Sequence, residues 1–471
     1  MKTEQISTFT DRVTKLRFCG AMAFTVDEKT FALFERKGHF ILLPDTVVGR
    51  LRKGFLDPLY VRKLHSRGFL SSEIISSSTN ISKKMSKALP EFFMVDLTKC
   101  CNMHCRYCLR DINTMEKSIS QERIGDICRF IVDYCDTYHL SDISVQAWGG
   151  EPLLELESLL HMREQIRPQR TRVHFSVETN ALLLTPDVLK KLYSYRIGIG
   201  ISIDGDHRSH DSQRVLPGGG GTHAIVERNL LAARRLYGRR IGTITTVTKN
   251  NAPYIEEILE YFATKLHLEN VKFNFVHQSS FNDCHYLCLT KAEIADVELR
   301  ILRKLVELLE RGYPIFDNNL RIKLNNILYR KYSDICHSRG CKGGLKMVVI
   351  GMDGGIYPCE LTDTPREQIG SIYEDSDLPR QIEQSKQGRD FYLKKSGVEC
   401  KECAWYIFCG GGCTVRTINS GKRPPAIDEI ECAVNSALYP ALIELVLKKP
   451  EIVECILCKD CTLHCACSNV T

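Results

Sequence analysis

Between residues 91 and 276, short apolar runs alternate with longer stretches in which apolar residues recur every three or four positions. The runs predict strands and the periodic stretches predict helices, because side chains repeat every second residue along a strand and about every 3.6 along a helix. The expected strands are 92–97, 143–148, 173–177, 197–203, 241–247 and 271–276, and the expected helices include 123–138, 186–193, 223–237 and 254–266. This alternation predicts an α/β fold, a partial (β/α)6 TIM-like barrel with parallel strands.

A smaller unit precedes this repeat. The stretch AMAFTV ending at Val26 and residues 39–43 predict short strands, and Pro44 with Asp45 opens a helix. A second helix is expected over 58–70, closed by Gly68, and the Ser- and Lys-rich segment that follows predicts a linker. The expected units are 1–86 with its linker, a barrel core 87–311, a connector 312–335, a cysteine-rich domain 336–440 and a cysteine-rich tail 441–471.

The 471 residues contain 22 cysteines, and the polar start Met1 to Gln5 does not resemble a secretory signal. We therefore expect a cytoplasmic chain, in which cysteines more often serve metal or redox roles than disulfides. No apolar run reaches the length of about 18 that a membrane span needs, so no membrane partner is expected. The net charge of +7 is modest for this length and does not indicate nucleic-acid binding.

Three cysteines follow the first expected strand in a C-x3-C-x2-C spacing: Cys101, Cys105 and Cys108. Three thiolates so close together could hold three irons of a four-iron cluster, leaving the fourth iron open to a ligand. Barrels of this kind place their chemistry at the carboxyl ends of strands, where these cysteines lie. A zinc knot or buried thiols fit the spacing alone, but the position and Tyr107 favour iron. We interpret Cys100 as a bystander.

With three further motifs, residues 92–275 resemble the radical S-adenosylmethionine superfamily. These motifs are Gly149-Gly150-Glu151-Pro152, then Thr179-Asn180 with Ala181 in place of the usual glycine, then Ser202-Ile203-Asp204. The resemblance implies that S-adenosylmethionine binds the open iron and yields an adenosyl radical on reduction. It places Gly149, Gly150 and Glu151 against the amino group of the cofactor, and Ser202 and Asp204 on its ribose. Taken alone, Asp204 would more often be a turn residue at a strand end.

The cysteine-rich half contains a seven-cysteine pattern that resembles the SPASM domain, with residues 348–357 predicting a β-hairpin ahead of Cys359. The resemblance implies two auxiliary [4Fe-4S] clusters, and thus three in all. The first would use Cys341, Cys359 and Cys413 of this pattern, with Cys336 as the natural fourth ligand, and the second would use Cys400, Cys403, Cys409 and Cys432. If Cys336 is not a ligand, the first cluster keeps an open iron. Two structural zinc sites are the alternative.

The tail adds Cys455, Cys458, Cys461, Cys465 and Cys467, whose first four members have the spacing of a bacterial ferredoxin run. A further cluster is one interpretation, and a tail of free thiols is the other.

The N-terminal unit resembles the small winged-helix peptide-recognition domain of ribosomal-peptide maturases, which takes a leader peptide as an added strand. A stabilising cap is the alternative. The expected partners are a precursor peptide with its leader and an electron donor such as ferredoxin or flavodoxin.

We therefore expect an oxidoreductase that forms thioether bonds between a peptide cysteine and a carbon of an acceptor residue, as ranthipeptide and sactipeptide maturases do. A formylglycine-forming anaerobic sulfatase maturase is the first alternative. In that family an aspartate directly follows the cysteine that corresponds to Cys359 and acts as a base. Here Glu360 stands in that position. It is either the candidate catalytic residue or a solvated loop residue. A non-catalytic, metal-binding peptide adaptor is the second alternative, and Glu151 and Ser202-x-Asp204 argue against it.

Overall fold

The computed structural model describes most of the chain between residues 3 and 458. The described ranges are 3–7, 9–10, 17–27, 30–34, 40–71, 88–110, 118–278, 283–329, 331–332, 334–337, 340–362, 367–374, 377–385, 400, 403, 405–419 and 427–458. The predicted linker, apart from Ser71, and the tail cysteines Cys461, Cys465 and Cys467 lie outside these ranges.

The N-terminal unit has two small antiparallel sheets and a core of its own, which includes Phe18, Leu33 and Val48. One sheet has the order β1 (Thr3–Ile6), β4 (Ala21–Asp27), β5 (Thr30–Phe34), β6 (Phe40–Pro44), and the other β2 (Phe9–Thr10), β3 (Arg17–Phe18), β7 (Leu70–Ser71). Helices α1 (Asp45–Arg52) and α2 (Val61–Ser66) complete it. The second helix starts later than expected because Asp57 accepts a hydrogen bond from Leu59 N and forms a turn.

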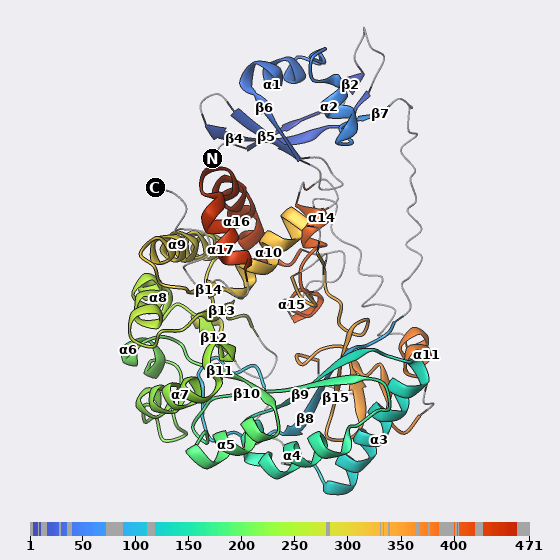
Figure 1. Ribbon diagram of the computed structural model, residues 1–471, viewed down its shortest axis with the longest axis vertical. Coiled ribbons are helices and arrows are strands. Elements are labelled where there is room, and N and C mark those ends of the chain that lie inside the picture. Colours follow the sequence, from blue (N-terminus) through green and yellow to red (C-terminus); the bar gives the residue numbers. More distant parts are fainter. Residues whose placement is uncertain are drawn as a thin grey trace.

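The main body is built on a ten-stranded sheet whose central strands are parallel, as the alternation predicted. The strands are β8 (Phe92–Thr98), β9 (Asp142–Gly149), β10 (Arg172–Thr179), β11 (Ile197–Ser202), β12 (Gly242–Val247), β13 (Asn270–Phe275), β14 (Phe316–Asp317), β15 (Met347–Ile350), β16 (Gly355–Tyr357) and β17 (Gly370–Ser371). The sheet curves so that one face is concave and helices follow its other face (Figure 1).

The helices of the main body are α3 (Gln121–Tyr138), α4 (Leu156–Gln165), α5 (Pro186–Ser194), α6 (His207–Asp211), α7 (His223–Tyr237), α8 (Ile255–Thr264), α9 (Lys291–Glu310), α10 (Asn318–Tyr329), α11 (Leu378–Gln384), α14 (Tyr406–Cys409), α15 (Thr414–Asn419), α16 (Glu429–Lys448) and α17 (Pro450–Leu457), with short 3-10 turns at Pro152–Glu155, Gly238–Arg240, Ala252–Tyr254 and His285–Leu287. Among them, α3, α5, α7 and α8 begin and end close to the predicted bounds. Alternate strand residues such as Val95, Val145 and Val177 pack under these helices, which leaves their neighbours facing the concave side.

The cysteine-rich half is joined to this sheet. The predicted hairpin forms as antiparallel β15 and β16, and β15 pairs in parallel with β8, whose edge it covers. The expected connector 312–335 contains β14, which pairs with β13, and the helix α10. Helix α16 crosses the expected boundary at residue 440, and Cys455 is a buried core thiol on α17.

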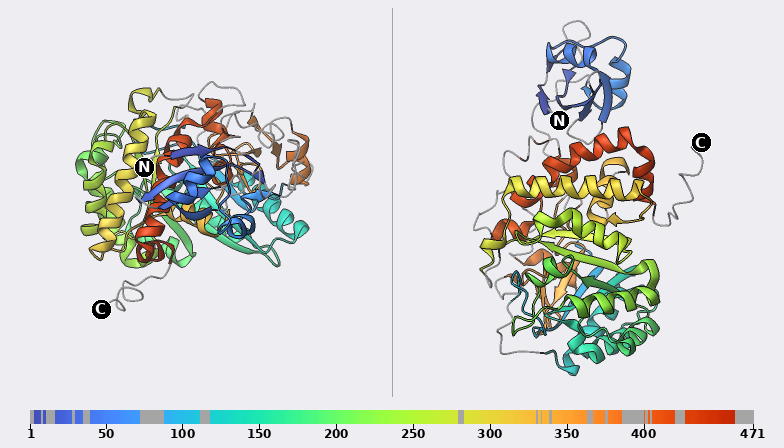
Figure 2. Two further views of the ribbon diagram at one scale, coloured as in Figure 1. Left: turned by 90° about the horizontal axis from the view of Figure 1, so that it is seen from above. Right: turned by 90° about the vertical axis from the view of Figure 1, so that its left-hand side faces the viewer.

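Helix α16 is long and apolar enough to cross a membrane, but half of its most apolar stretch is buried inside the protein. It packs against α9 and α17, on the side of the main body that faces the N-terminal unit (Figures 1 and 2). Its position is that of a core helix.

Candidate functional site

The loop that carries Cys101, Cys105 and Cys108 follows β8 and is held by hydrogen bonds to a second loop, at residues 213–215. His104 N donates to the Val215 carbonyl at 2.7 Å, and Arg106 N donates to the Gln213 carbonyl at 2.9 Å. Burial raises the pKa of the Cys105 thiol to about 12, against the opposing effect of Arg214, and Cys108 and Cys101 add to the rise. The three thiols therefore lie close to one another.

The glycine pair 149–150 clamps the start of this cysteine loop. A Cβ on Gly149 would stand 2.3 Å from the Thr98 carbonyl oxygen, and one on Gly150 would stand 2.2 Å from that of Cys100. In turn Gly150 N donates to Thr98 O at 2.7 Å. Glycine is therefore required at both positions, because the two loops touch through their backbones and leave no room for a Cβ atom. The resemblance placed these glycines against the amino group of the cofactor. Their neighbour in the structure is the cysteine loop, and the cofactor contact stays a prediction.

Glu151 is buried and holds the next strand end. Its Oε1 accepts from the Thr179 hydroxyl at 2.7 Å, and its Oε2 accepts from Asn180 N at 2.8 Å. Burial raises its pKa, and these hydrogen bonds act in the opposite direction. Asn180 Nδ2 donates to Asn102 Oδ1 at 2.7 Å and lies 3.8 Å from Cys101 Sγ. The first three sequence motifs therefore meet at one place.

Asp204 lies under the same loop, fully buried. Its Oδ2 accepts from the Tyr107 hydroxyl at 2.6 Å and from Gln213 Nε2 at 2.7 Å, while its Oδ1 accepts from Thr246 N at 2.9 Å. Ser202, at the end of β11, is half-buried on the concave side. The contacts of Asp204 in the structure are thus to the cysteine loop and its supports, and a contact with a ribose stays a prediction.

Arg214 supplies positive charge to this centre. Its Nη1 donates to the Tyr107 hydroxyl at 2.6 Å, and its Nε has no hydrogen-bond partner among the described residues. It lowers the pKa of both Cys101 and Cys105 against the dominant effect of burial. Three clustered thiols beside a buried cation suit an anionic iron–sulfur cluster, so the residues present fit the group that the motif predicts.

The expected first auxiliary set also comes together. Cys359 and Cys413 belong to one apolar cluster behind the hairpin. Burial raises the pKa of Cys359, and Glu360, Cys413, Cys341 and Cys336 each add to the rise. Four mutually interacting thiols fit a four-iron cluster as ligands.

The second auxiliary set is described in part. The pKa of Cys403 is raised by desolvation and also by Cys432, so these two thiols are neighbours. Burial raises the pKa of Cys409 to about 12, and Asn435 of α16 acts in the opposite direction. Across the described ranges, no three His, Cys, Asp or Glu side chains converge tightly enough to ligate a single metal ion. A cluster needs wider spacing, because its ligands surround four irons rather than one.

Glu360 lies where the barrel meets the hairpin. It lines a pocket together with Asp96, Lys99, Arg110 and Cys359, and the Cys359 thiol donates to its Oε2 at 3.0 Å. Its carboxylate oxygen is within hydrogen-bond distance of a donor, as a proton acceptor must be. The geometry therefore allows Glu360 to act as a base.

Three polar residues of the concave face were not identified from the sequence. Glu178 on β10 and Lys272 on β13 are half-buried, and each influences the pKa of the other. The carboxylates of Glu178 and Glu360 and the Cys336 thiol raise the pKa of Lys272, although desolvation opposes this. Trp148 Nε1 is buried without a hydrogen-bond partner among the described residues. Glu178 and Lys272 could have been identified from the sequence, because each is a charged residue that alternates with buried neighbours along its strand.

Residues 95–262 match the Radical SAM superfamily. A cysteine-type anaerobic sulfatase-maturating enzyme of Clostridium perfringens is 24% identical over 342 residues, which are 70% of this chain and 89% of that protein.

Two solved structures share the fold. Native anSMEcpe with bound AdoMet has a TM-score of 0.66 at 20% identity and covers 76% of this chain and 100% of its own. Streptococcus suis SuiB bound to the precursor peptide SuiA has a TM-score of 0.51 at 14% identity and covers 86% of this chain and 96% of its own.

Proposed function

We propose that this chain, which carries a radical SAM domain at residues 95–262, is a peptide maturase that forms thioether cross-links in a ribosomally made precursor. The supporting observation is the N-terminal unit with its own core, placed beside α16 in addition to the barrel and the cysteine-rich half (Figure 2). A sulfatase maturase would not need such a unit. The precursor leader would pair with an edge strand, β1 or β6 of one sheet or β2 or β7 of the other.

Cys101, Cys105 and Cys108 would hold the cluster that binds S-adenosylmethionine, with Glu151, Ser202 and Asp204 as the proposed cofactor contacts. When bound, the cofactor would supply a radical able to take one hydrogen atom from the acceptor carbon, and an auxiliary cluster would provide an acceptor for the remaining electron. Arg214 balances negative charge at the thiolates. The concave face, with Glu178 and Lys272, would orient the acceptor residue of the peptide.

In the net reaction, one S–H and one C–H bond of the peptide are replaced by one C–S bond. The acceptor carbon gives up a hydrogen atom, and the peptide thiol gives up a proton. Glu360 is the proposed acceptor of that proton, because it lies in a pocket between the barrel and the hairpin. The peptide therefore loses two hydrogen atoms and one alkylatable thiol for each cross-link.

The second candidate is a cysteine-type sulfatase maturase, favoured by the likeness to the Clostridium perfringens enzyme over 89% of that protein. In that reaction the cysteine loses its sulfur and becomes an aldehyde. Glu360 in place of the expected aspartate, and the N-terminal unit, argue for the thioether reaction.

Mass spectrometry separates the two candidates. The reduced enzyme is incubated with S-adenosylmethionine and with two peptides: a cysteine-rich peptide encoded beside the gene and a cysteine-containing sulfatase peptide. We expect the first to lose two hydrogen atoms together with one iodoacetamide-reactive thiol. An aldehyde that reacts with a hydrazine, formed on the sulfatase peptide alone, would establish the second candidate instead.

A further inference from the structure

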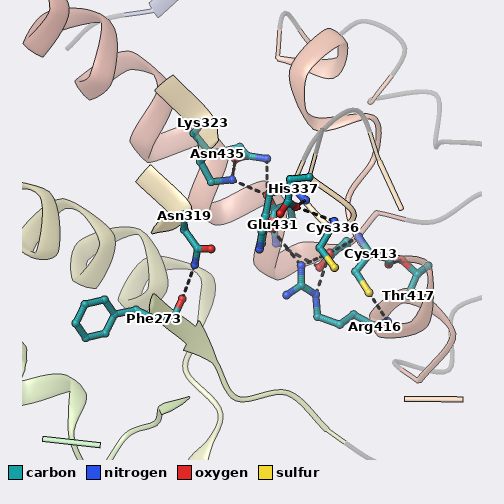
Figure 3. A network of polar contacts seen from close by, with 12 residues as sticks. Phe273, Asn319, Lys323, Cys336, His337, Cys413, Arg416, Thr417, Glu431 and Asn435 are labelled. Carbon is teal, nitrogen blue, oxygen red and sulfur yellow. Dashed lines mark hydrogen bonds and ion pairs between the residues drawn. The ribbon is translucent and has the colours of Figure 1, made fainter. Parts of the chain in front are cut away.

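Buried charges from three helices meet beside Cys336 and Cys413 of the first auxiliary cysteine set (Figure 3). Lys323 of α10 donates from Nζ to Glu431 Oε1 at 2.7 Å and to Asn435 Oδ1 at 2.6 Å, both on α16. Arg416 of α15 donates from Nη2 to Asp428 Oδ2 at 2.7 Å and to Glu431 Oε2 at 3.2 Å. Glu431 is therefore shared by both cations.

The charges of this network balance in a place that water barely reaches. The side chain of Lys323 is 1% exposed and that of Glu431 is 6% exposed. Those of Arg416 and Asp428 are 18% and 1% exposed. Two cations face two anions, so each charge is compensated only while the others are present. Removing one charge leaves a buried charge of the opposite sign without full compensation, which is strongly unfavourable.

One side of the network touches the first cysteine set. Asp428 Oδ2 accepts from Cys413 N at 2.7 Å, and Arg416 N lies 3.5 Å from Cys413 Sγ as donor. Gly412 leaves the room for this contact, since a Cβ there would stand 2.6 Å from Asp428 Oδ2. The ring of His337, next to Cys336, lies 3.5 Å from Glu431 Oε2. Figure 3 shows Cys336 and Cys413 side by side at this end.

The other side touches the second set. Phe408, which precedes Cys409 on α14, packs its ring against that of Tyr439 on α16 with the centroids 5.6 Å apart. Glu431, Lys323 and Asn435 all influence the pKa of the Cys409 thiol. Cys432 follows Glu431 directly on α16. The network is also tied to the barrel, because Asn319 Nδ2 on α10 donates to the Phe273 carbonyl of β13 at 2.7 Å.

We infer that this network is a positioning device that fixes both auxiliary cysteine sets at once, with Lys323 as its central residue although it ligates neither. The inference rests on the proposed function, in which both sets hold four-iron clusters. Its consequence is that the two sets assemble together: a fault in the shared charges disturbs both, while the site at Cys101, Cys105 and Cys108 is spared.

The test counts iron in the full-length protein after anaerobic reconstitution. Wild type should hold about twelve irons per chain, four for each cluster. Lys323→Met keeps the length of the side chain and removes its charge, so it should retain about four irons and lose the electron paramagnetic resonance signals of both auxiliary clusters. Cleavage of S-adenosylmethionine without peptide should persist in this variant, which shows that the barrel is folded.

The double variant K323M/E431Q restores the charge balance and should regain about twelve irons. Lys304→Met is the matched control. Lys304 on α9 also pairs with two carboxylates, Glu260 at 2.8 Å and Glu307 at 2.8 Å, but it lies in an ion-pair group that includes no cysteine. Full iron content is expected in this control. A second arm, Asn435→Leu, keeps every charge and should weaken the signal of the second set.

Full auxiliary signals in Lys323→Met would overturn the inference, as would loss of one set with the other intact. If Lys323→Met is insoluble, the double variant decides. A soluble K323M/E431Q protein with about twelve irons supports the inference. A double variant without auxiliary iron, together with full auxiliary signals in Asn435→Leu, overturns it. Failure of the proposed function is distinguishable, because the peptide masses test thioether formation independently of iron content. If the two sets hold no four-iron clusters, wild type itself would hold only about four irons.

Discussion

The Tyr107 hydroxyl donates to Asp204 Oδ2 at 2.6 Å, joining residues 97 positions apart in the chain. Tyr107 stands between Cys105 and Cys108, and Asp204 follows the end of β11, so this hydrogen bond links the cysteine loop to the barrel wall. Arg214 donates to the same hydroxyl at 2.6 Å. The tyrosine therefore fixes the loop through one buried, charge-assisted contact.

Tyr107→Phe removes this link and leaves Asp204 with one donor fewer in a buried site. We expect a loss of about 2 kcal/mol in the free energy of unfolding and weaker retention of the cluster at Cys101, Cys105 and Cys108. Chemical denaturation and iron counts measure these effects. Tyr134→Phe is the control, because Tyr134 donates one neutral hydrogen bond to the Pro90 carbonyl at 3.1 Å. Equal iron retention in the two variants would contradict the role given to Tyr107.

Ala181, which follows Asn180, has a φ of 68° and is fully buried. A residue with a Cβ is strained in this left-handed conformation, whereas glycine is not. Ala181→Gly should therefore raise the free energy of unfolding by about 1 kcal/mol. Ala233→Gly in α7 should lower it by at least about 1 kcal/mol, because that site is helical. Thermal unfolding of both variants checks the signs, and a less stable Ala181→Gly would refute the strain.

Glu298 of α9 is buried near Asp317, Lys323 and Glu431, and desolvation, followed by Asp317, raises its pKa to about 8 from a usual 4.5. Between these values the unfolded chain releases the proton that the folded chain keeps, so stability falls as the pH rises. Glu298→Gln does not titrate. The free energy of unfolding of Glu298→Gln minus that of wild type should therefore rise by about 1 kcal/mol per pH unit between pH 5 and 8, and stay constant above pH 8.

Denaturation curves of wild type and Glu298→Gln at pH 5 and pH 8 measure this change. Glu157→Gln, at a carboxylate on the surface, is the control for the exchange itself. A difference between wild type and Glu298→Gln that stays the same at both pH values would show that Glu298 does not titrate in this range.

Removal of residues 1–86 should leave cleavage of S-adenosylmethionine intact and weaken binding of a leader peptide. The cofactor motifs all lie in the barrel, whereas leader binding would depend on main-chain pairing with an edge of the N-terminal sheets. Titration of a fluorescent leader peptide against full-length and truncated protein measures this, with iron counted in both samples. Equal affinity at equal iron content would make the unit a cap rather than a recognition domain.

Local pattern predicted most of the fold. The six parallel strands and the hairpin at 347–357 each have a periodicity that can be read within a few residues. The pairing of β15 with β8 could not be predicted, because it joins segments about 250 residues apart and depends on which edge of the sheet stays uncovered. The second N-terminal helix was overextended since the turn at Asp57 interrupts an otherwise suitable pattern.

The cysteines and motifs of the site could also be found in the sequence, because each is short and ordered along the chain. Their partners could not. The carbonyl oxygens of Thr98 and Cys100 fill the space beside Gly149 and Gly150, and Tyr107 and Gln213 engage Asp204. The charges shared by Lys323 and Glu431 connect residues 108 positions apart, which no local spacing reveals.

The formation of deoxyadenosine from S-adenosylmethionine under reducing conditions tests the central claim most directly. The account predicts turnover by wild type, none by the variant in which Cys101, Cys105 and Cys108 are alanine, and retained turnover when Cys400, Cys403 and Cys409 are alanine. The reason is that the first three thiols lie together beside Arg214 at the end of β8, apart from the second auxiliary set. Deoxyadenosine formed by the first variant at the wild-type rate would contradict the account.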